Sequence, residues 1–518
     1  MKHFKRFGFG LLALLLVLGT MSGCRVITDT ETTTTTTATD QEDDATPILS
    51  FEKNALQGEE MVIRANVQLI NANSFDAKQD GDVINDAVYN RNKQLTAWFG
   101  CAIRVEEFTG NTSDDGMYYE LLEIKDTPTY HLVSNADYKM VRYAAEGFFH
   151  DLAGQPYIDL NQDYYDDSYN DAYNVGGRQY LVTGKFSLSW YRYQIVTFFN
   201  RNMFDEKGIA YPYQTVLDHK WTVAEMGKTA NKFYEDLNGD GLEDEYDQFG
   251  YVLFVSSGSS QTDGFMSAFN LRLVEKDADG YLKAMDIDQK TWGAPIEKFR
   301  DMLYEEGVYS SDLFETASGN TATVEKFTKK NAEAAMITYR MCILEEDEMT
   351  SLSQNNQGYG ILPLPMADEN QDDYISYMHY MGLAFGIPKA MVGDDLKNAT
   401  MFLEAFAYVS YHTTVPAYYE KALGDNLKDD QAARSMLQII DSNVVVDPVN
   451  VYYNRYFNLT TGTLRPVYSA YPTEEITDVL AEAYKDGAFE ANVQALNEKF
   501  KALDQALAEA GYPNAGKT

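Results

Sequence analysis

The fold class follows from residues 61–105, which read MVIRANVQLINANSFDAKQDGDVINDAVYNRNKQLTAWFGCAIRV. The first part alternates polar residues with apolar ones at the period of a β-strand, the apolar positions being Ile63, Ala65, Val67 and Leu69. Gly100 then stops a helix whose apolar stripe consists of Ile84, Val88, Leu95 and Trp98. Residues 103–105 predict the next strand. Strand, helix and strand in this order predict a parallel pair and an α/β fold.

Similar signals recur further along the chain. Residues 193–199 predict a strand that ends at Asn200. Two later segments carry clear helical stripes, one at 396–406 and one at 493–507. Because 518 residues exceed what one ordinary core accommodates, we expect two lobes.

The N-terminus has the pattern of a secretory signal. Two lysines and an arginine precede an apolar run at 11–18 that is too short to cross a bilayer. Small residues then lead to Cys24, an ending that resembles a bacterial lipobox, in which the cysteine becomes the first mature residue and carries lipid. We therefore expect a lipoprotein signal peptide at 1–23. A plain cleaved signal with an incidental cysteine is the alternative.

Residues 24–57 predict a disordered tether. The part at 28–46 consists almost entirely of Thr, Asp and Glu, so it has no apolar surface to bury. A solvated arm of this kind, following a lipid anchor, would let the folded body stand away from a membrane.

Composition narrows the class of partner. A formal net charge of −37 argues against nucleic acid, which needs clustered Lys and Arg, and predicts a well-solvated surface. Beyond the signal only Cys101 and Cys342 remain, and we expect two buried thiols rather than a disulfide framework. The chain has 38 Tyr, 27 Phe and 4 Trp, and such aromatic rings suit the apolar face of a sugar.

An acidic loop at 236–247, DLNGDGLEDEYD, has the ligand spacing of a calcium site. Gly241 stands at position 6, where such a loop must turn sharply, and Asp247 replaces the usual Glu at position 12. A predicted helix precedes the loop and a strand follows it, so this is not a helix–loop–helix unit. The alternative is an acidic turn without metal. The expected calcium ligands are Asp236, Asn238, Asp240, the Leu242 carbonyl, Asp244 and Asp247.

Several separated segments together resemble one family, the extracellular solute-binding proteins of ABC importers, in the group of maltose-type sugar receptors. The resemblance depends on their order and spacing across about residues 60–410. It rests on residues 87–105, 177–184, 197–209, 220–251, 327–336, 358–365 and 382–388. The chain departs from the family pattern at Tyr339–Arg340, where a Trp is usual.

The resemblance implies a two-lobed, type II periplasmic-binding-protein-like fold with a hinge and an interlobe cleft. Lobe 1 would comprise 58–187 plus 378–450, and lobe 2 would comprise 188–377 plus 451–518. It further implies that ligand binding closes the lobes, and that the closed form docks on ABC permease subunits. We expect a monomer held at the outer face of the cell membrane by lipid on Cys24.

Ligand contacts are expected at the crossovers between lobes and after strands. The crossovers would lie near 187–190 and 377–383, and an acid that follows the first strand lies in the usual place for ligands of open α/β sheets. An arginine among the candidates could bind two sugar hydroxyls or an acid group. The candidates are Asp76, Trp190, Tyr191, Trp292, Tyr339, Arg340, Tyr377 and His379.

The sequence therefore predicts a lipid-anchored receptor for a carbohydrate, with an oligosaccharide favoured, and no catalytic residues. Two alternatives stay open. One is a receptor for another solute, such as a peptide or polyamine. The other is a tethered exported glycoside hydrolase, because many carboxylates are present although no pair stands out.

Overall fold

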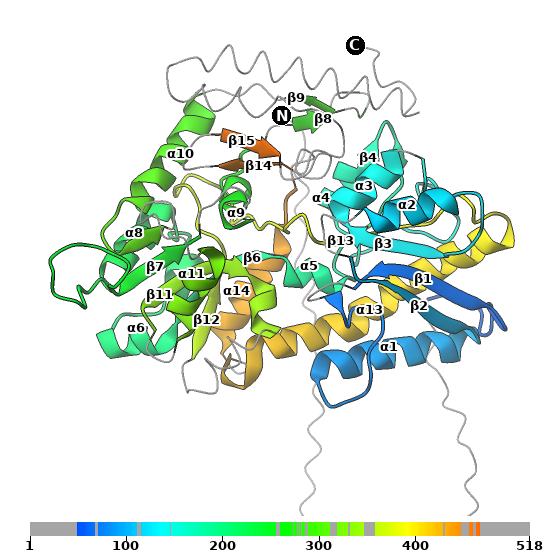
Figure 1. Ribbon diagram of the computed structural model, residues 1–518, viewed down its shortest axis with the longest axis horizontal. Helices are drawn as coiled ribbons and strands as arrows, with labels where there is room; N and C mark the ends of the chain where they lie inside the picture. The colour runs from blue at the N-terminus through cyan, green and yellow to red at the C-terminus, as the bar shows by residue number, and fades with distance from the viewer. Residues whose placement is uncertain are drawn as a thin grey trace, which may run out of the picture. The chain divides into compact units, whose positions relative to one another are not determined.

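Two β-sheets organise the chain in the computed structural model (Figure 1). The structure describes residues 49–446 together with 455–458 and 463–466. Within that span it leaves out 68–70, 111–114, 146, 255–259, 273, 277, 279, 281, 285–288, 311–318, 330–331, 346–357 and 428–429. The signal peptide, most of the tether and the helix expected at 493–507 lie outside the described residues.

The first sheet has the strand order β13-β3-β1-β2. Its strands are β1 (Glu60–Asn66), β2 (Ala102–Phe108), β3 (Leu132–Ala136) and β13 (Leu383–Gly386). β1 runs parallel to both β2 and β3, and β13 pairs antiparallel with β3. The parallel pair expected from residues 61–105 is confirmed. β3 is buried at every residue, as is typical of strands covered on both faces.

The helix between β1 and β2 is α1 (Val83–Phe99), and its ends are fixed by local chemistry. The Asp82 carboxylate accepts hydrogen bonds from the N–H groups of Ile84 and Asn85, which satisfies two free donors at the helix start. At the other end Gly100 adopts φ 69°, a left-handed conformation that favours glycine. The predicted stop at Gly100 is therefore confirmed.

The second sheet has the order β10-β7-β11-β6-β12. Its strands are β6 (Ile195–Asn200), β7 (Phe249–Leu253), β10 (Val308–Ser310), β11 (Ala334–Arg340) and β12 (Tyr359–Leu362). β7 is parallel to β10 and β11, whereas β6 is antiparallel to β11 and β12. The strand predicted to end at Asn200 is thus present, and it begins two residues later than expected.

Shorter elements surround the two sheets. The helices among them are α2 (Gly116–Glu123), α3 (Asp137–Ala145), α4 (Asp167–Tyr173), α5 (Leu188–Arg192), α6 (Arg201–Lys207), α7 (Tyr213–Leu217), α8 (Val223–Asn231), α9 (Ser260–Ala268), α10 (Gln289–Leu303), α11 (Gly319–Thr328) and the 3₁₀ turn η2 (Met341–Glu345). Three two-stranded ribbons pair β4 (Asn174–Val175) with β5 (Arg178–Gln179), β8 (Val274–Lys276) with β9 (Leu282–Ala284), and β14 (Arg455–Asn458) with β15 (Thr463–Pro466).

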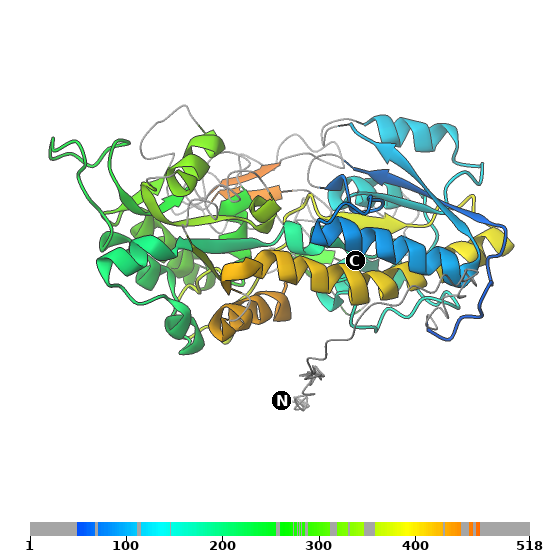
Figure 2. The same ribbon diagram turned by 90° about the horizontal axis from the view of Figure 1, so that it is seen from below.

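One long helix, α13 (Asp394–Leu427), contacts elements beside both sheets. It runs along α1 (Figure 2) and also contacts α5, η2 and α14 (Gln431–Ser442). Near its C-terminal end, the carbonyl of Ala422 accepts a hydrogen bond from the Tyr359 hydroxyl of β12. α13 therefore connects the packing of the two sheets. Among the described residues, no helix combines the length and apolar character needed to cross a membrane.

Within the described part of the chain, two crossovers link strands of one sheet to strands of the other, and these two lie against each other. The first runs through α5 into β6, and the second runs through 377–382 into β13. The Ile195 N–H donates to the Tyr377 carbonyl at 3.1 Å, and the His379 N–H donates to the Tyr193 carbonyl at 2.9 Å. Paired crossovers of this kind form a natural axis for rotation of one sheet relative to the other.

The lobe ranges given above stay a prediction. The strands of the first sheet fall within 58–187 and 378–450, and those of the second within 188–377. α14 belongs to the range assigned to lobe 1, yet it contacts β12 and α7 beside the second sheet. Apart from β14 and β15, residues 451–518 lie outside the described residues.

Candidate ligand-binding site

A chain of aromatic rings lies along the second crossover, between a carboxyl group at one end and a guanidinium at the other. We call it the crossover cluster. Its rings, in spatial order, are Tyr138, Tyr380, His379 and Tyr193, and we include Asp137, which precedes Tyr138 in the chain, and Arg340, whose charge acts on His379 and Tyr193. The ring centroids of Tyr138 and Tyr380 are 5.7 Å apart, those of Tyr380 and His379 are 3.9 Å apart, and those of His379 and Tyr193 are 6.0 Å apart.

The carboxyl end of the first sheet supplies one side of the cluster. β3 ends at Ala136 and α3 begins at once, so Asp137 and Tyr138 emerge where the strand stops. The Asn66 amide, at the end of β1, donates to the Asn135 side chain at 2.9 Å, which ties the two strand ends together. The Asp137 N–H donates to the Gly382 carbonyl at 2.8 Å and fixes this end against the second crossover.

The second sheet supplies the other side through the last residue of β11. Arg340 pairs with Ile195 in the ladder, and its Nη2 donates to the Tyr339 hydroxyl at 3.2 Å. Its positive charge acts on two rings of the cluster: after burial, it is the second cause of the lowered pKa of His379, and it opposes the burial that raises the pKa of Tyr193 to about 12. The guanidinium therefore lies close to the rings of Tyr193 and His379.

Burial and charge set the protonation states here. Burial raises the pKa of the Asp137 carboxyl well above its usual range. Burial, and then the positive charge of Arg340, lower the pKa of His379 well below its usual range. His379 Nδ1 accepts the Met381 N–H at 3.3 Å, so its neutral ring carries the proton on Nε2. The imidazole adds no second cation to the cluster.

Among the residues that the structure describes, three buried polar atoms around the cluster have no hydrogen-bond partner, namely Asn71 Oδ1, Asp137 Oδ1 and Arg340 Nε. Such atoms are costly to leave unsatisfied, and each needs a physical account. They come from three separate segments, after β1, after β3 and at the end of β11. Their convergence on one set of rings is the pattern expected of a site that a polar ligand completes.

A buried ion pair lies next to the cluster, because Arg192, which forms it, directly precedes Tyr193 in the chain. The Arg192 guanidinium, at the end of α5, binds the Glu345 carboxylate through two hydrogen bonds of 2.8 Å each. It also donates to Ser74 Oγ at 2.8 Å and to Asn73 Oδ1 at 2.7 Å. Because Asn73 and Ser74 follow β1 whereas Glu345 follows β11, Arg192 links segments that belong to both sheets.

The structure brings together only some of the residues proposed from the sequence. Tyr339, Arg340 and His379 lie at or beside the cluster, as described above. Asp76 is exposed, and its carboxylate accepts from Asn92 at 3.4 Å beside α1 instead. Trp292 belongs to α10, and its side chain lies outside the described residues.

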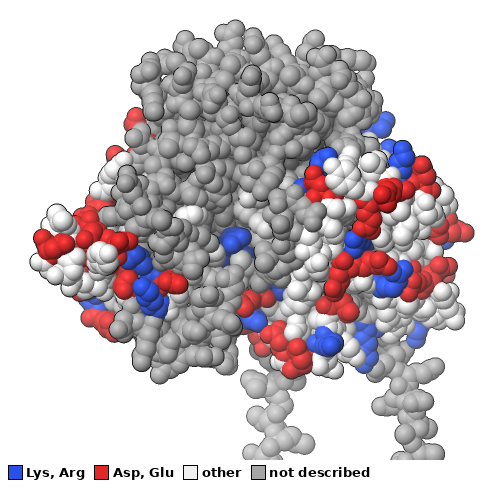
Figure 3. All heavy atoms as spheres, viewed as in Figure 1, with Lys and Arg blue, Asp and Glu red and all other residues white. Residues whose placement is uncertain are grey.

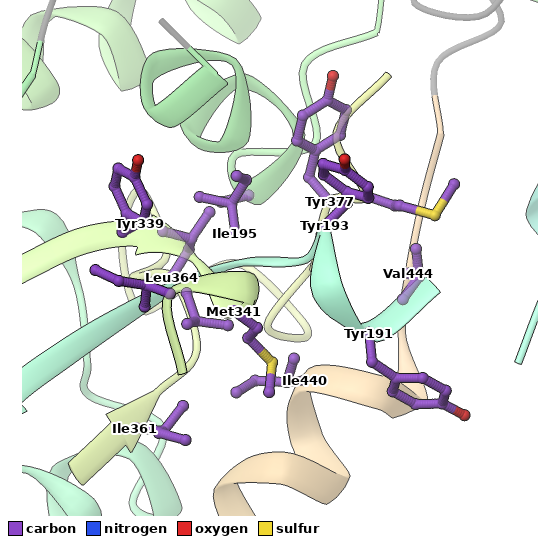
Figure 4. Close-up of a cluster of buried hydrophobic side chains, with 14 of the residues drawn as sticks. Tyr191, Tyr193, Ile195, Tyr339, Met341, Ile361, Leu364, Tyr377, Ile440 and Val444 are labelled. Atoms are coloured by element: carbon purple, nitrogen blue, oxygen red, sulfur yellow. The ribbon is translucent and has the colours of Figure 1, made fainter. Parts of the chain in front are cut away.

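Trp190 and Tyr191 lie in the core rather than at the cluster. The Trp190 ring packs edge-on against Tyr169, with its N–H donating to Asp441. The ring of Tyr191 packs against Tyr418 and Tyr419 of α13. Figure 4 shows Tyr191 pointing away from Tyr193 across the crossover. A helix turns its side chains by about 100° per residue, so neighbours in α5 face different partners.

Tyr377 is also a core residue. Its side chain is 1% exposed and belongs to the buried hydrophobic cluster drawn in Figure 4. The backbone carbonyl, by contrast, accepts the Ile195 N–H and so joins the two crossovers. Its contribution to the site is therefore to position the crossover.

Sequence reasoning missed Asn71, Asp137, Tyr138, Tyr193 and Tyr380. A usable signal was present for Asp137, because the apolar pair Leu132–Val133 is followed within four residues by polar side chains. That pattern marks a short buried strand with its ligand-facing end. For Tyr193 and Tyr380 the sequence carried no comparable signal, since aromatic residues are frequent throughout the chain.

The predicted calcium loop is organised by its own carboxylates. Asp236 accepts from the N–H groups of Gly239 and Gly241 at 2.6 and 2.8 Å. Both glycines have positive φ, which supplies the sharp turn expected at this point. Asp247 is buried and accepts from the Tyr234 hydroxyl at 3.0 Å. Across the described part of the chain, no three His, Cys, Asp or Glu side chains are grouped closely enough to hold a metal ion.

A separate cavity of about 610 Å³ lies between α4 and the segment that follows α14. Five Asp residues and two cations line it, and none of its lining residues belongs to the crossover cluster. Lys185 and Asp441, two of these residues, are 3.5 Å apart. We therefore assign the candidate site to the cluster, where the buried polar atoms lack partners, and not to this cavity.

Surface charge and cysteines agree with the sequence. Over the described part of the face in Figure 3, acidic and basic side chains are interspersed without a continuous basic area.

Cys101 and Cys342 are both buried, and no disulfide joins them. Burial raises the pKa of the Cys101 thiol to about 11, which keeps it protonated.

Comparison with known proteins gives matches only at the level of structure. A search of protein-family models returns no match, and neither does a search of curated proteins. A sugar transporter from Rhizobium etli, solved in an open conformation, has a TM-score of 0.50 and 12% identity, with 85% of this chain and 99% of that chain covered. A solute-binding protein from Thermotoga lettingae bound with α-D-tagatose gives 0.49 and 13%, with 85% and 100% covered.

A third solved structure is an ABC substrate-binding protein from Listeria monocytogenes in complex with cycloalternan. It has a TM-score of 0.46 and 14% identity, with 87% of this chain and 98% of that chain covered. Identities this low establish a shared architecture and leave the ligand open. The chain therefore shares the two-sheet α/β fold of the Rhizobium etli sugar transporter.

Proposed function

We propose that this protein is the solute-binding component of an ABC importer and that it captures a carbohydrate, with an oligosaccharide favoured, at the crossover cluster. The observation that carries the proposal is the row of rings between Asp137 and Arg340, bordered by buried polar atoms without partners. Aromatic faces pack against the C–H faces of sugars, and the polar atoms at each end would bind hydroxyl groups. The solved sugar transporter of the same fold agrees with this choice of ligand class.

Capture would involve movement about the paired crossovers. Tyr138, Tyr193 and His379 are each 3% exposed or less, so a ligand reaches them only when the sheets move apart. Ligand that contacts Asp137 from one sheet and Arg340 from the other would then favour the closed arrangement, because only that arrangement offers both contacts.

Location and delivery are part of the same proposal. Lipid on Cys24, with the tether at 24–57, would hold the receptor at the outer face of the cell membrane beside its permease. A receptor without chemistry of its own is useful only close to the transporter that it supplies. We propose in addition that the loop at 236–247 holds a structural calcium ion, because its acidic ligand spacing and its glycine turn are both present.

Incubation of the full chain with a panel of oligosaccharides tests the proposal. A higher melting temperature with the sugar recovered intact is the expected result, since a ligand that binds only the folded state stabilises it. Released sugar products would favour the glycoside hydrolase. A shift of the melting temperature only with peptides or polyamines would favour a receptor for another solute.

A further inference from the structure

The guanidinium of Arg340 is an incompletely used binding group. An arginine side chain carries five N–H donors and is always charged. Among the described residues, Arg340 makes one side-chain hydrogen bond, to the Tyr339 hydroxyl. Its Nε is buried without a partner. Within the described part of the chain, no carboxylate lies within ion-pair distance of Arg340.

Arg192, which directly precedes Tyr193 in the chain, gives the contrast. Its guanidinium is 0% exposed and binds the Glu345 carboxylate through two N–H groups, so its charge is neutralised inside the protein. Arg192 is thus buried and ion-paired, whereas the Arg340 guanidinium has no carboxylate partner among the described residues. An unpaired guanidinium removed from water is unfavourable unless an anion joins it.

The Asp137 end of the cluster suits a different ligand group from the Arg340 end. Asp137 is 1% exposed, and its Oδ1 lacks a partner. A buried carboxyl group binds hydrogen-bond donors such as hydroxyl groups. A neutral, buried carboxyl group offers no positive charge to an anion, so the anionic group of a ligand belongs at the Arg340 end.

We propose that the ligand is an acidic carbohydrate, whose carboxylate forms a two-point pair with Arg340 and whose hydroxyl groups donate to Asp137. This inference rests on the proposed carbohydrate receptor and narrows its substrate class to uronate-containing oligosaccharides. The planar fork of arginine matches a carboxylate through two parallel N–H···O bonds, which a neutral sugar cannot offer. The neutral state of His379 leaves Arg340 as the cation that faces this group.

Calorimetric titration of the full chain with matched pairs of sugars tests the assignment. The probes are trimers of galacturonate, glucuronate, mannuronate and guluronate, each paired with its neutral methyl ester. We expect at least one acid trimer to bind about 10-fold to 100-fold more tightly than its ester, the range that a charged hydrogen bond contributes. Raised salt should weaken binding of the acid and leave that of the ester unchanged.

Variants separate the charge pair from a general effect. Arg340→Gln should lower the affinity for the acid to that of the ester, and Arg340→Lys should restore part of it. Arg104→Gln, on the exposed edge of β2, removes the same charge far from the cluster and should change neither. Equal losses for acid and ester in Arg340→Gln would overturn the pairing. If this variant does not fold, the acid–ester comparison and its salt dependence on the natural chain decide alone.

The failures are distinguishable. Tight binding of neutral oligosaccharides with no preference for acids would overturn the acidic ligand and leave the carbohydrate receptor standing. Failure to bind any carbohydrate, acid or neutral, would overturn the proposed function itself.

Discussion

The buried pair of Arg192 and Glu345 should dominate the stability of the crossover region. Both side chains are almost inaccessible, at 0% and 8% exposure, and four hydrogen bonds of 2.7–2.8 Å hold the guanidinium. Glu345→Ala leaves the charge of Arg192 buried without its partner. Removing one partner of such a pair costs about 3–5 kcal/mol, a large share of the roughly 5–15 kcal/mol that stabilises a typical domain.

Urea denaturation, followed by far-ultraviolet circular dichroism, measures the loss of unfolding free energy. The double variant Arg192→Met/Glu345→Met should be at least about 2 kcal/mol more stable than the sum of its two single variants predicts, because the uncompensated charge has gone. As a control, Arg104→Ala breaks a pair whose side chains are 44% and 51% exposed, and it should cost less than about 1 kcal/mol. A Glu345→Ala protein within about 1 kcal/mol of the natural chain would refute the reasoning.

Three further predictions concern other parts of the fold. Gly250→Ala should lower the unfolding free energy by about 1–3 kcal/mol or more, since the new Cβ would lie 1.9 Å from the Ala230 carbonyl oxygen of α8; an unchanged melting temperature would contradict this. Asp137→Asn should gain stability relative to the natural chain as the pH rises from about 4 to 7. The raised pKa means that the stability contributed by the neutral acid is complete below the unfolded pKa and is lost as the pH rises through the folded one; a pH-independent difference in urea midpoint would argue against it. A calcium chelator should lower the melting temperature of the natural chain and have no effect on Asp240→Ala, whereas equal responses would count against the loop.

Much of the architecture could be predicted from local patterns. The stripe of α1 and the glycine stop after it are signals within one segment, and the structure has both. The alternation expected in the first strand is not seen in the burial of β1, where Met61, Val62 and Asn66 are buried as well as Ile63 and Ala65. The separated motifs then indicated both sheets and the two crossovers. Local patterns of this kind predict the element correctly because each depends on only a few neighbouring residues.

The site could be predicted only in part. Tyr339 and Arg340 were accessible to sequence reasoning because they end an apolar strand. Trp190 and Tyr191 were not, because the crossover forms a helical turn in α5, and the face each side chain takes depends on α4 and α13, which lie far away in the chain. The position of Asp137 depends on where β3 stops, which the first sheet determines through its pairing.

The crossover cluster as a carbohydrate site is tested most directly by its rings. The measurement is calorimetric titration, with the sugar that raises the melting temperature, of the natural chain, Tyr380→Ala, and the control Tyr119→Ala, whose ring on α2 is 59% exposed. We predict that Tyr380→Ala weakens binding about 10-fold or more, because a stacked aromatic ring contributes roughly 0.5–1.5 kcal/mol beyond the area that it buries. Tyr119→Ala should bind as the natural chain does. Unchanged affinity in Tyr380→Ala, with the protein folded, would contradict the assignment of the site.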